Sequence, residues 1–521
     1  MKLRNTYHSA RSVICMDSSH AYEIIEEFGS HVINLEKTDF ILRWDSDVMM
    51  PTEGSEARAT QRSTISAARH QYLTDPKLKS ALEAIDTDSL SDDEQSVVRE
   101  IRREHTIESN VSEDLNSRLS GSSSSAYEAW KQANAENDWN TFGSKLEKQF
   151  DLKKEWAKEV DPDSDPYEVL WANRTGYLSQ PYIPLETVIE IFDSLRNGLI
   201  PLIDEIQSCE KELSTDIFEG AFDTEIQMDV AREAISLLGF DWGRARLDLA
   251  PHPFSFGTQF DVRLTTRFDE SNAISGLMSV IHEYGHTKYT HGLPKEEYGT
   301  PIGEPRGLGV HESQSRFFEN HIGRSLGFWE EFLPMMKSHY PKQLVNVSPR
   351  QAYEAVNQVY TDNRIRVNAD ELSYHMHIIL RTEIEQSIFA DEITVEDVPS
   401  VWETKMEEYL GIKPRSVAEG PLQDPHWSQN MPAFIGYTIG SVLAAQIHAA
   451  MERDIGPTNN IIREGNIELI HEWLRESIHS HGQRYKTDEL IKRATGENLT
   501  ADYFLSYVEK KYGDLYDISI N

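Results

Sequence analysis

The sequence IHEYGH, residues 281–286, places a glutamate directly after one histidine and a second histidine four positions later. Residues four apart on an α-helix share a face, with Cβ atoms ~5–6 Å apart, so His282 and His286 can direct both imidazoles at one metal ion. Glu283 lies one step around the helix, poorly placed to join the same ligand set but able to reach a water in an open coordination position. The pattern therefore indicates a metal site with Glu283 as a general base.

A third ligand must come from another segment of the chain. Glu312, in GVHESQSRFFEN, lies 26 residues after His286 and is the preferred candidate, because it is expected on the next helix. Spacing alone leaves other residues open as the third ligand: Glu297, Glu304, Glu319 and His311. Of these, Glu319 shares the helical face of Glu312 two turns later and could instead support a ligand from behind.

Two histidines and one glutamate leave a coordination position for water. Zinc lowers the pKa of such a water from about 15.7 to about 7, so Glu283 could take its proton while the ion polarises a scissile carbonyl. The chemistry predicted is hydrolysis of a peptide or amide. The alternative is a solvated helix with two unrelated histidines, but imidazoles and a carboxylate facing a packed interior are costly without a metal or other partners. The same donors also accept Co²⁺ or Mn²⁺.

The metal motif lies within a stretch that has the pattern of a helix, SNAISGLMSVIHEYGHTKYTHGL. We expect Ser271 to cap this helix and Gly292 to end it. Three further helices are predicted: one from Ala352 with Ser348 as its cap, one in which Leu372 begins a four-residue repeat of apolar side chains, and one near Gly440.

The segment DVRLTTRF, residues 261–268, alternates apolar and polar side chains and predicts a strand, which must pair within a small sheet beside the metal site. An open edge of that sheet could hold an extended peptide. The serine run at residues 120–126 is interpreted as a loop and cap before a helix near Tyr127, not as a domain boundary. We therefore predict a mainly α protein, one large helical body with a small β-sheet.

The composition, with 39% hydrophobic and 26% charged residues, is that of a soluble globular protein. The formal net charge of -36 argues against nucleic acid and anionic membranes as partners. It is compatible with a halophilic source or with an ordinary acidic cytosolic enzyme. We read no signal peptide, and two cysteines without CxxC spacing, Cys15 and Cys209, fit a reducing compartment, so a cytoplasmic location is expected.

Six motifs resemble, in order, those of the carboxypeptidase Taq family of zinc metallopeptidases, and the similarity runs from about Leu35 to Tyr516. They are HPF (252–254), DVRLT (261–265), HEYGH (282–286), HESQ (311–314), IRVNAD (365–370) and GPLQDPHW (420–427). The resemblance implies Glu312 as the third zinc ligand. It also implies a mostly helical homodimer that holds its site in a deep groove and removes single residues from peptide C-termini with broad preference.

Such an enzyme must bind the terminal carboxylate of its substrate with a fixed cation, and the planar fork of arginine does so with two parallel hydrogen bonds. The resemblance favours Arg366 for this role, with Arg263 as second choice and a plain salt bridge as the alternative for either. His426 is a candidate to contact substrate or the developing oxyanion, and its alternative is a packed histidine. His252, in the HPF motif, is a further candidate for substrate binding.

The sequence departs from the family pattern in two places. Asn368 stands where the family usually has glutamate. After residue 427 the segment SQNMPAFIGYTIG is one residue shorter, with Phe434 and Gly436 replacing a tyrosine and a proline, so Tyr437 is the remaining phenol candidate.

Residues 1–25 lie outside the resemblance and are assigned no role, and residues 26–521 are predicted to form one domain. The rival functions are a helical zinc oligopeptidase that cuts internally and an inactive peptide-binding protein.

Overall fold

The structure, a computed structural model, describes residues 16–177, 180–213, 216–428, 431–432 and 434–518. Cys15 and residues 1–15 of the predicted N-terminal extension lie outside these ranges. Helix α1 begins at Ser18, so the predicted boundary at residue 25 falls inside a helix. Among the described residues, no helix is both long enough and apolar enough to span a bilayer.

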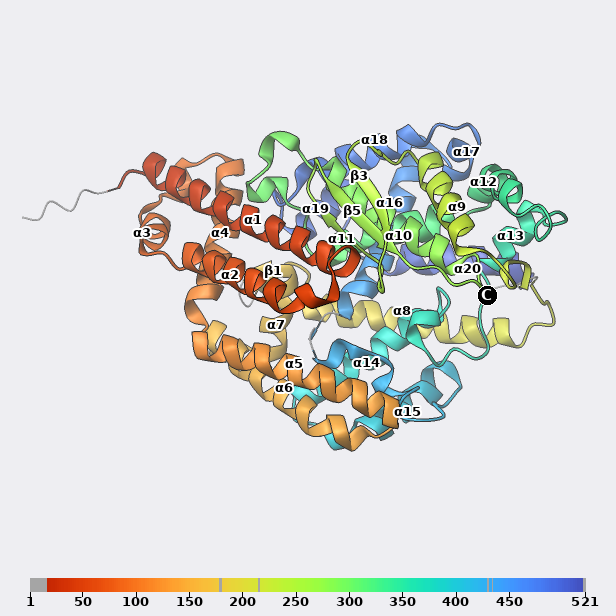
Figure 1. The fold of residues 1–521 in the computed structure, drawn as a ribbon, viewed down its shortest axis with the longest axis horizontal. Helices are drawn as coiled ribbons and strands as arrows, with labels where there is room; N and C mark the ends of the chain where they lie inside the picture. The colour runs from red at the N-terminus through yellow and green to blue at the C-terminus, as the bar shows by residue number, and fades with distance from the viewer. Residues whose placement is uncertain (1–15, 178–179, 214–215, 429–430, 433, 519–521) are drawn as a thin grey trace, which may run out of the picture.

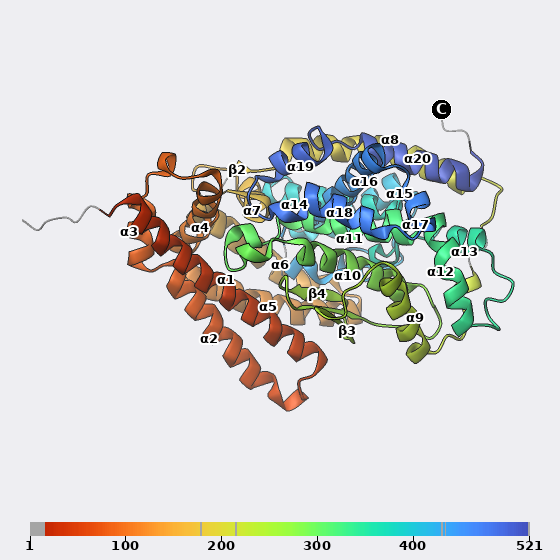
Figure 2. The same ribbon diagram turned by 90° about the horizontal axis from the view of Figure 1, so that it is seen from above.

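Helices dominate the fold, as predicted. The first half of the chain forms α1 (Ser18–Val48), α2 (Ser55–Leu73), α3 (Pro76–Ala84), α4 (Asp92–Asn110), α5 (Glu113–Glu136), α6 (Trp139–Val160), α7 (Pro166–Thr175), α8 (Leu185–Gln207) and α9 (Thr224–Leu237). Helices α1 and α2 lie side by side at one end of the molecule, and α5 and α6 form a second pair along one side (Figures 1 and 2).

The second half of the chain carries the predicted metal motif and the helices packed around it. It forms α10 (Ser275–Gly292), α11 (Leu308–Arg316), a π-helix (Phe317–Gly323), α12 (Leu326–His339), α13 (Pro349–Ala355), α14 (Ser373–Phe389), α15 (Val398–Leu410), α16 (Ile435–Ile455), α17 (Thr458–Arg463), α18 (Ile467–Ser477), α19 (Thr487–Thr495) and α20 (Asp502–Tyr516). Helix α11 packs against both α10 and α16 and lies inside the body (Figure 1).

A three-stranded sheet lies against α10, as the sequence predicted. Its strands are β3 (Ala245–Leu249), β4 (Phe254–Gly257) and β5 (Val262–Thr266), in the order β3-β5-β4. Strand β5 is central, parallel to β3 and antiparallel to β4, with Leu264 paired to both Leu247 and Ser255. Strand β4 is therefore an outer strand, and it packs on α10 near the metal motif (Figure 2). A second sheet pairs β1 (Gly176–Tyr177) with β2 (Gln180–Pro181).

Two hydrophobic clusters hold the described residues together. The larger one contains the apolar side chains of α5 to α20. The smaller joins α1, α3 and α4 through Ile24, Ile25, Leu78 and Val98 and meets the body at Ile302. The N-terminal helices thus have a small core of their own, which is continuous with the segment between α10 and α11.

Two local predictions are wrong. The serine run at residues 120–126 lies inside α5, because Ser122 is buried and accepts a hydrogen bond from Gln149 of α6 (2.7 Å), so packing overrides the loop-forming composition. Ser271 does not cap α10. The side chain of Asn272 accepts hydrogen bonds from the backbone of Ile274 and Ser275 instead, both at 2.9 Å.

Other local predictions are confirmed. Helix α10 ends at Gly292, and α13 begins at Pro349 behind a capping box formed by Ser348 and Gln351. The apolar repeat in α14 is buried at Leu372, Met376, Leu380 and Ile384.

Helices α10 and α11 cross at Gly285, the fourth residue of the HEYGH motif. A Cβ atom there would lie 2.6 Å from Ser315 Cα and closer still to the carbonyl oxygen of Gln314. Neither contact can relax by a side-chain rotation, because both atoms belong to the backbone of α11. The glycine therefore sets how near the two helices come.

We expect Gly285→Ala to lower the free energy of unfolding by about 1–3 kcal/mol, because the added methyl group separates two packed backbones. Urea denaturation would measure the change. Gly121→Ala in α5 is the matched control, since a Cβ there meets nothing within 4 Å, and it should be neutral or stabilising. Equal behaviour of the two variants would contradict a close crossing at Gly285.

Candidate metal centre

The crossing of α10 and α11 brings His282, His286 and Glu312 together. Glu312 Oε2 lies 3.8 Å from His282 Nε2 and 3.5 Å from His286 Nε2. One donor atom from each of the three residues lies within 4.8 Å of the others. Ligands on a tetrahedral zinc ion at ~2.0–2.1 Å are themselves about 3.3 Å apart, so these donors need to move little to hold such an ion. Their chemistry, two imidazoles and one carboxylate, fits zinc.

Both histidines turn their Nδ1 atoms away from Glu312 and toward other partners. His282 Nδ1 lies 2.9 Å from Glu319 Oε2, and His286 Nδ1 lies 3.1 Å from the carbonyl oxygen of His311. An acceptor on Nδ1 fixes the tautomer that leaves the Nε2 lone pair free. Both Nε2 atoms therefore face Glu312, and an oxygen acceptor lies beside the Nδ1 atom of each ring.

Burial and charge act differently on the two imidazoles. Burial lowers the pKa of His286 well below its ordinary value, so this ring is neutral. Burial also lowers the pKa of His282, but the neighbouring Glu312 and Glu319 carboxylates outweigh it and raise the pKa overall. The site thus already attracts positive charge at His282, which is the property a metal centre requires.

Glu283 is buried beside this cluster, and its Oε2 atom has no hydrogen-bond partner among the described residues. Burial raises the pKa of Glu283 to about 7, although the nearby charge of His282 and the hydroxyl of Ser255 on β4 act in the opposite direction. A carboxylate with that pKa is suited to accept and return a proton near neutral pH. A buried carboxylate oxygen without a protein partner beside a cluster of metal-ligand side chains is typical of a catalytic group.

The residues left open as rival ligands occupy other places. Glu304 pairs with Lys37 of α1 at 2.5 Å, and Glu297 accepts a hydrogen bond from Thr300. His311 packs against His286, with their Nδ1 atoms 2.6 Å apart. None of the three joins the cluster of donors found among the described residues. Glu319 contacts the Nδ1 atom of His282 and so supports this proposed ligand from behind, which was the alternative role considered for it from spacing.

Three predicted substrate-binding residues form a second group next to the cluster. Arg366 Nε donates to Asp424 Oδ2 (2.7 Å), while Asp424 Oδ1 accepts from the backbone of His426 (3.1 Å) and also contacts its Nδ1 atom. The rings of Phe434 and Tyr437 lie 5.1 and 5.9 Å from the Arg366 guanidinium. Burial raises the pKa of Tyr437 above its ordinary value, so the phenol keeps its proton and can donate a hydrogen bond.

The other two predicted residues lie on the side of the sheet. Arg263 donates to Asp261 through Nε (3.3 Å) and Nη2 (2.9 Å), and its guanidinium stacks 4.3 Å from the ring centre of Trp44 in α1. His252 is exposed just before β4, where its carbonyl oxygen accepts a hydrogen bond from Thr265 (3.2 Å).

Two adjoining cavities follow strand β4. One, of about 580 Å³, is lined by Ser255 of β4, His311 of α11 and charged side chains of α1 and α4. The other, of about 230 Å³, is lined by Trp44 and Arg263. The two cavities share Lys37, Phe40, Phe256 and Gly257. Open space thus leads from Ser255 and His311 along the outer strand toward Arg263.

Sequence reasoning did not identify several residues that organise the site. Arg316 bridges Glu312 and Glu319, Asp424 holds Arg366 and His426, and Trp44 stacks on Arg263. The i,i+4 spacing of Glu312 and Arg316 was a visible signal for the first of these. Asp424 lies two residues before His426 in the GPLQDPHW motif, whereas the Asp424–Arg366 and Trp44–Arg263 contacts join segments more than fifty residues apart, for which periodicity holds no signal.

Comparison with known proteins gives consistent matches along nearly the whole chain. A family model described as carboxypeptidase Taq (M32) metallopeptidase matches residues 24–512. Thermostable carboxypeptidase 1 of Thermus thermophilus is 36% identical over 513 residues, 96% of this chain and 100% of that protein. Carboxypeptidase 1 of Bacillus subtilis is 33% identical over 480 residues, 91% of this chain and 95% of that protein.

Solved structures agree with the sequence matches. The crystal structure of an M32 carboxypeptidase from Deinococcus radiodurans has a TM-score of 0.90 at 33% identity and covers 96% of this chain and 100% of its own. A Pyrococcus furiosus carboxypeptidase structure has a TM-score of 0.89 at 32% identity and covers 94% of this chain and 99% of its own.

The two arginine–aspartate pairs near the site allow a direct comparison of burial. Side chains in the Arg366–Asp424 pair are 12% and 4% exposed, against 22% and 49% for Arg263–Asp261. We expect Asp424→Asn to lower the free energy of unfolding in urea by up to about 3–5 kcal/mol, because it leaves a buried cation uncompensated. Asp261→Asn should cost at most about 1 kcal/mol. Similar losses in both would show that burial does not distinguish the pairs.

Proposed function

Because this chain belongs to the carboxypeptidase Taq (M32) metallopeptidase family, as its motifs predicted, we propose that it is a zinc-dependent carboxypeptidase that releases single amino acids from peptide C-termini with broad preference. One observation carries the proposal. The donors of His282, His286 and Glu312 converge, and the unpartnered Oε2 atom of Glu283 lies buried beside them. A ligand set with a general base next to it is the arrangement that metal-assisted hydrolysis needs.

In this proposal His282, His286 and Glu312 hold the ion. A bound zinc ion supplies a water of lowered pKa and polarises the carbonyl of the scissile bond. Glu283 accepts the proton of the attacking water at Oε2 and delivers it to the leaving amine, for which its pKa of about 7 is suited. The same donors accept Co²⁺ or Mn²⁺.

Peptides with a free C-terminus are the proposed substrates. The cavity beside β4 offers the space for an extended chain, and the outer position of β4 allows main-chain hydrogen bonds to it. Arg366 is proposed to bind the terminal carboxylate, with Arg263 as the alternative. His426 and Tyr437, which lie beside Arg366, are proposed to donate to substrate or to the developing oxyanion. A homodimer is carried over from the family resemblance alone.

Two other functions use the same residues differently. A zinc oligopeptidase would cut internal bonds and need no carboxylate clamp. An inactive peptide-binding protein would keep the cavity but not the chemistry, and the complete set of donors together with Glu283 argues against it.

A time course on a mixed-sequence peptide, followed by mass spectrometry, tests the proposal. We expect stepwise loss of single residues from the C-terminus, abolished by a chelator and restored by added zinc. The same peptide with an amidated C-terminus should resist cleavage. Internal fragments would favour the oligopeptidase instead, and no cleavage with any divalent ion would favour the binding protein.

The Glu283→Gln variant isolates the proton transfer from metal binding. We expect kcat to fall by about 10²–10⁴-fold, because general base catalysis contributes that much, while zinc still raises the thermal unfolding temperature. A Glu283→Gln variant with unchanged kcat would remove Glu283 from the mechanism.

Removing each arginine separately tests which one binds the terminal carboxylate. We expect Arg366→Gln to raise KM about 10- to 100-fold for free-acid peptides, the value of one or two hydrogen bonds to a charged group. Arg263→Gln is the matched variant and should change KM little. The reverse result would assign the clamp to Arg263, and unchanged KM in both would exclude either arginine.

A further inference from the structure

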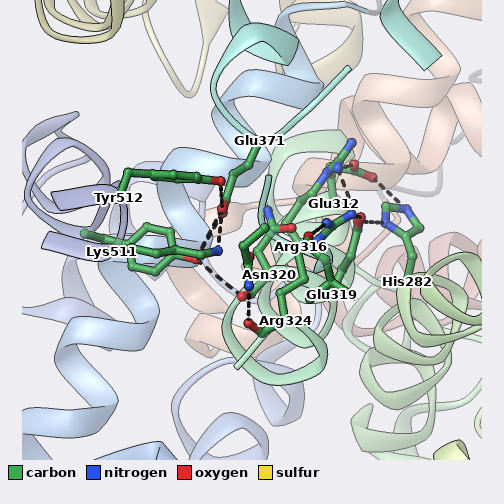
Figure 3. A network of polar contacts seen from close by, with 12 residues as sticks. His282, Glu312, Arg316, Glu319, Asn320, Arg324, Glu371, Lys511 and Tyr512 are labelled. Atoms are coloured by element: carbon green, nitrogen blue, oxygen red, sulfur yellow. Dashed lines mark hydrogen bonds and ion pairs between the residues drawn. The ribbon is translucent and has the colours of Figure 1, made fainter. Parts of the chain in front are cut away.

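Arg316, the last residue of α11, contacts two carboxylates of the candidate metal centre with one guanidinium group. Its Nε atom donates to Glu312 Oε1 at 2.9 Å, and its Nη1 atom donates to Glu319 Oε2 at 3.2 Å. Figure 3 shows the guanidinium between the two acids, with His282 on the far side of Glu319. Arg316 therefore contacts one proposed ligand directly and a second one through Glu319.

The two oxygens of Glu312 have different surroundings. Oε1 accepts the hydrogen bond of Arg316, whereas Oε2 faces the Nε2 atoms of His282 and His286. An oxygen that accepts a charge-assisted hydrogen bond at this distance is a poorer donor to a cation. With this contact in place, only one oxygen of Glu312 would be free to hold an ion, which would leave a coordination position for water.

Glu319 is held from both sides. Its Oε2 atom accepts from His282 Nδ1 and Arg316, and its Oε1 atom accepts from Arg324 Nη2 at 3.2 Å. The contact with Glu319 holds the Nδ1 edge of the His282 ring, so the opposite Nε2 atom faces Glu312 Oε2.

The plane of the Arg316 guanidinium is also fixed. It stacks 4.6 Å from the ring centre of Tyr374 in α14, and its side chain is only 15% exposed. The Arg366 guanidinium lies 5.9 Å from the same ring. A lysine in place of Arg316 would carry the charge but could not hold two acids from one plane.

We propose that Arg316 is a positioning residue that makes Glu312 a one-oxygen ligand and, through Glu319, aims His282 at the same ion. The proposal rests on the proposed function, because it presupposes that His282, His286 and Glu312 bind a metal. It adds that the geometry of the site depends on a residue that touches neither metal nor substrate.

The test compares metal binding in wild type, Arg316→Lys and Arg316→Met. Competition with a chromogenic chelator gives the zinc affinity, and the visible absorption of the Co²⁺-substituted protein reports coordination number. We expect Arg316→Met to bind zinc about 10–100-fold more weakly. Its cobalt bands should lose intensity, because a second Glu312 oxygen joins the ion and raises the coordination number.

Arg316→Lys keeps the positive charge, and it provides a second test if Arg316→Met fails to fold. We expect it to recover part of the affinity but to show the weakened cobalt bands, since the ammonium cannot hold Glu312 and Glu319 together. Arg350→Met is the matched control, because Arg350 pairs with Glu354 at the same i,i+4 spacing in α13 (2.8 Å), and it should leave both measurements unchanged.

The outcomes separate the two proposals. If wild type binds no divalent ion, the proposed function fails. If wild type binds zinc and both Arg316 variants match its affinity and cobalt spectrum, the role of Arg316 is overturned while the proposed function stands. A loss of affinity in Arg316→Met with an unchanged cobalt spectrum in both variants would also overturn it, because Glu312 would then not depend on the arginine.

Discussion

The close approach of three helices determines the geometry of the candidate metal centre. Gly285 of α10 lies against the backbone of α11, and a Cβ atom at Gly440 of α16 would lie 2.6 Å from Glu312 Cβ. Glycine on both sides of α11 therefore lets the helix that carries Glu312 come within reach of His282 and His286. Protein interiors are close-packed, so a methyl group at either position would push α11 away, and this shift would also displace the donor atoms.

This packing buries several carboxylates, and neighbouring arginines compensate most of their charge. Glu312, Glu319 and Glu283 are each less than 10% exposed, and Arg316 and Arg324 neutralise the first two. The π-helix that carries Glu319 contacts α20, where the hydroxyl of Tyr507 lies within hydrogen-bond distance of the carbonyl of Asn320 (3.3 Å) and of Glu371 (3.1 Å).

Lys511 and Tyr512 extend the same network from α20. They contact Glu371 at 2.6 and 3.0 Å. Only Glu283 retains an unpartnered carboxylate oxygen beside the donors, among the residues that the structure describes. The buried acids around the donors are thus Glu312 and Glu319, which contact arginines, and Glu283, which has an oxygen without a protein partner.

The sequence predicts best what depends on local periodicity. The i,i+4 spacing of His282 and His286, the strand at Val262–Thr266 and the capping box at Ser348 are readable because each is set by neighbouring residues. The serine run in α5 was misjudged because its helix is stabilised by Gln149 from another element. The Asp424–Arg366 and Trp44–Arg263 contacts were missed for the same reason, since each joins distant segments of the chain.

Arg366 is more buried than Arg263, and its surroundings make it the better candidate to bind the terminal carboxylate in the proposed function. Arg366 lies among aromatic rings and uses only Nε on Asp424, whereas Arg263 spends both Nε and Nη2 on an aspartate that is half exposed. A protein of net charge -36 repels a peptide carboxylate at long range, so recognition must come from short-range contacts. Such contacts are strongest where water is excluded and the fork is already held in one plane, and these two conditions are met at Arg366.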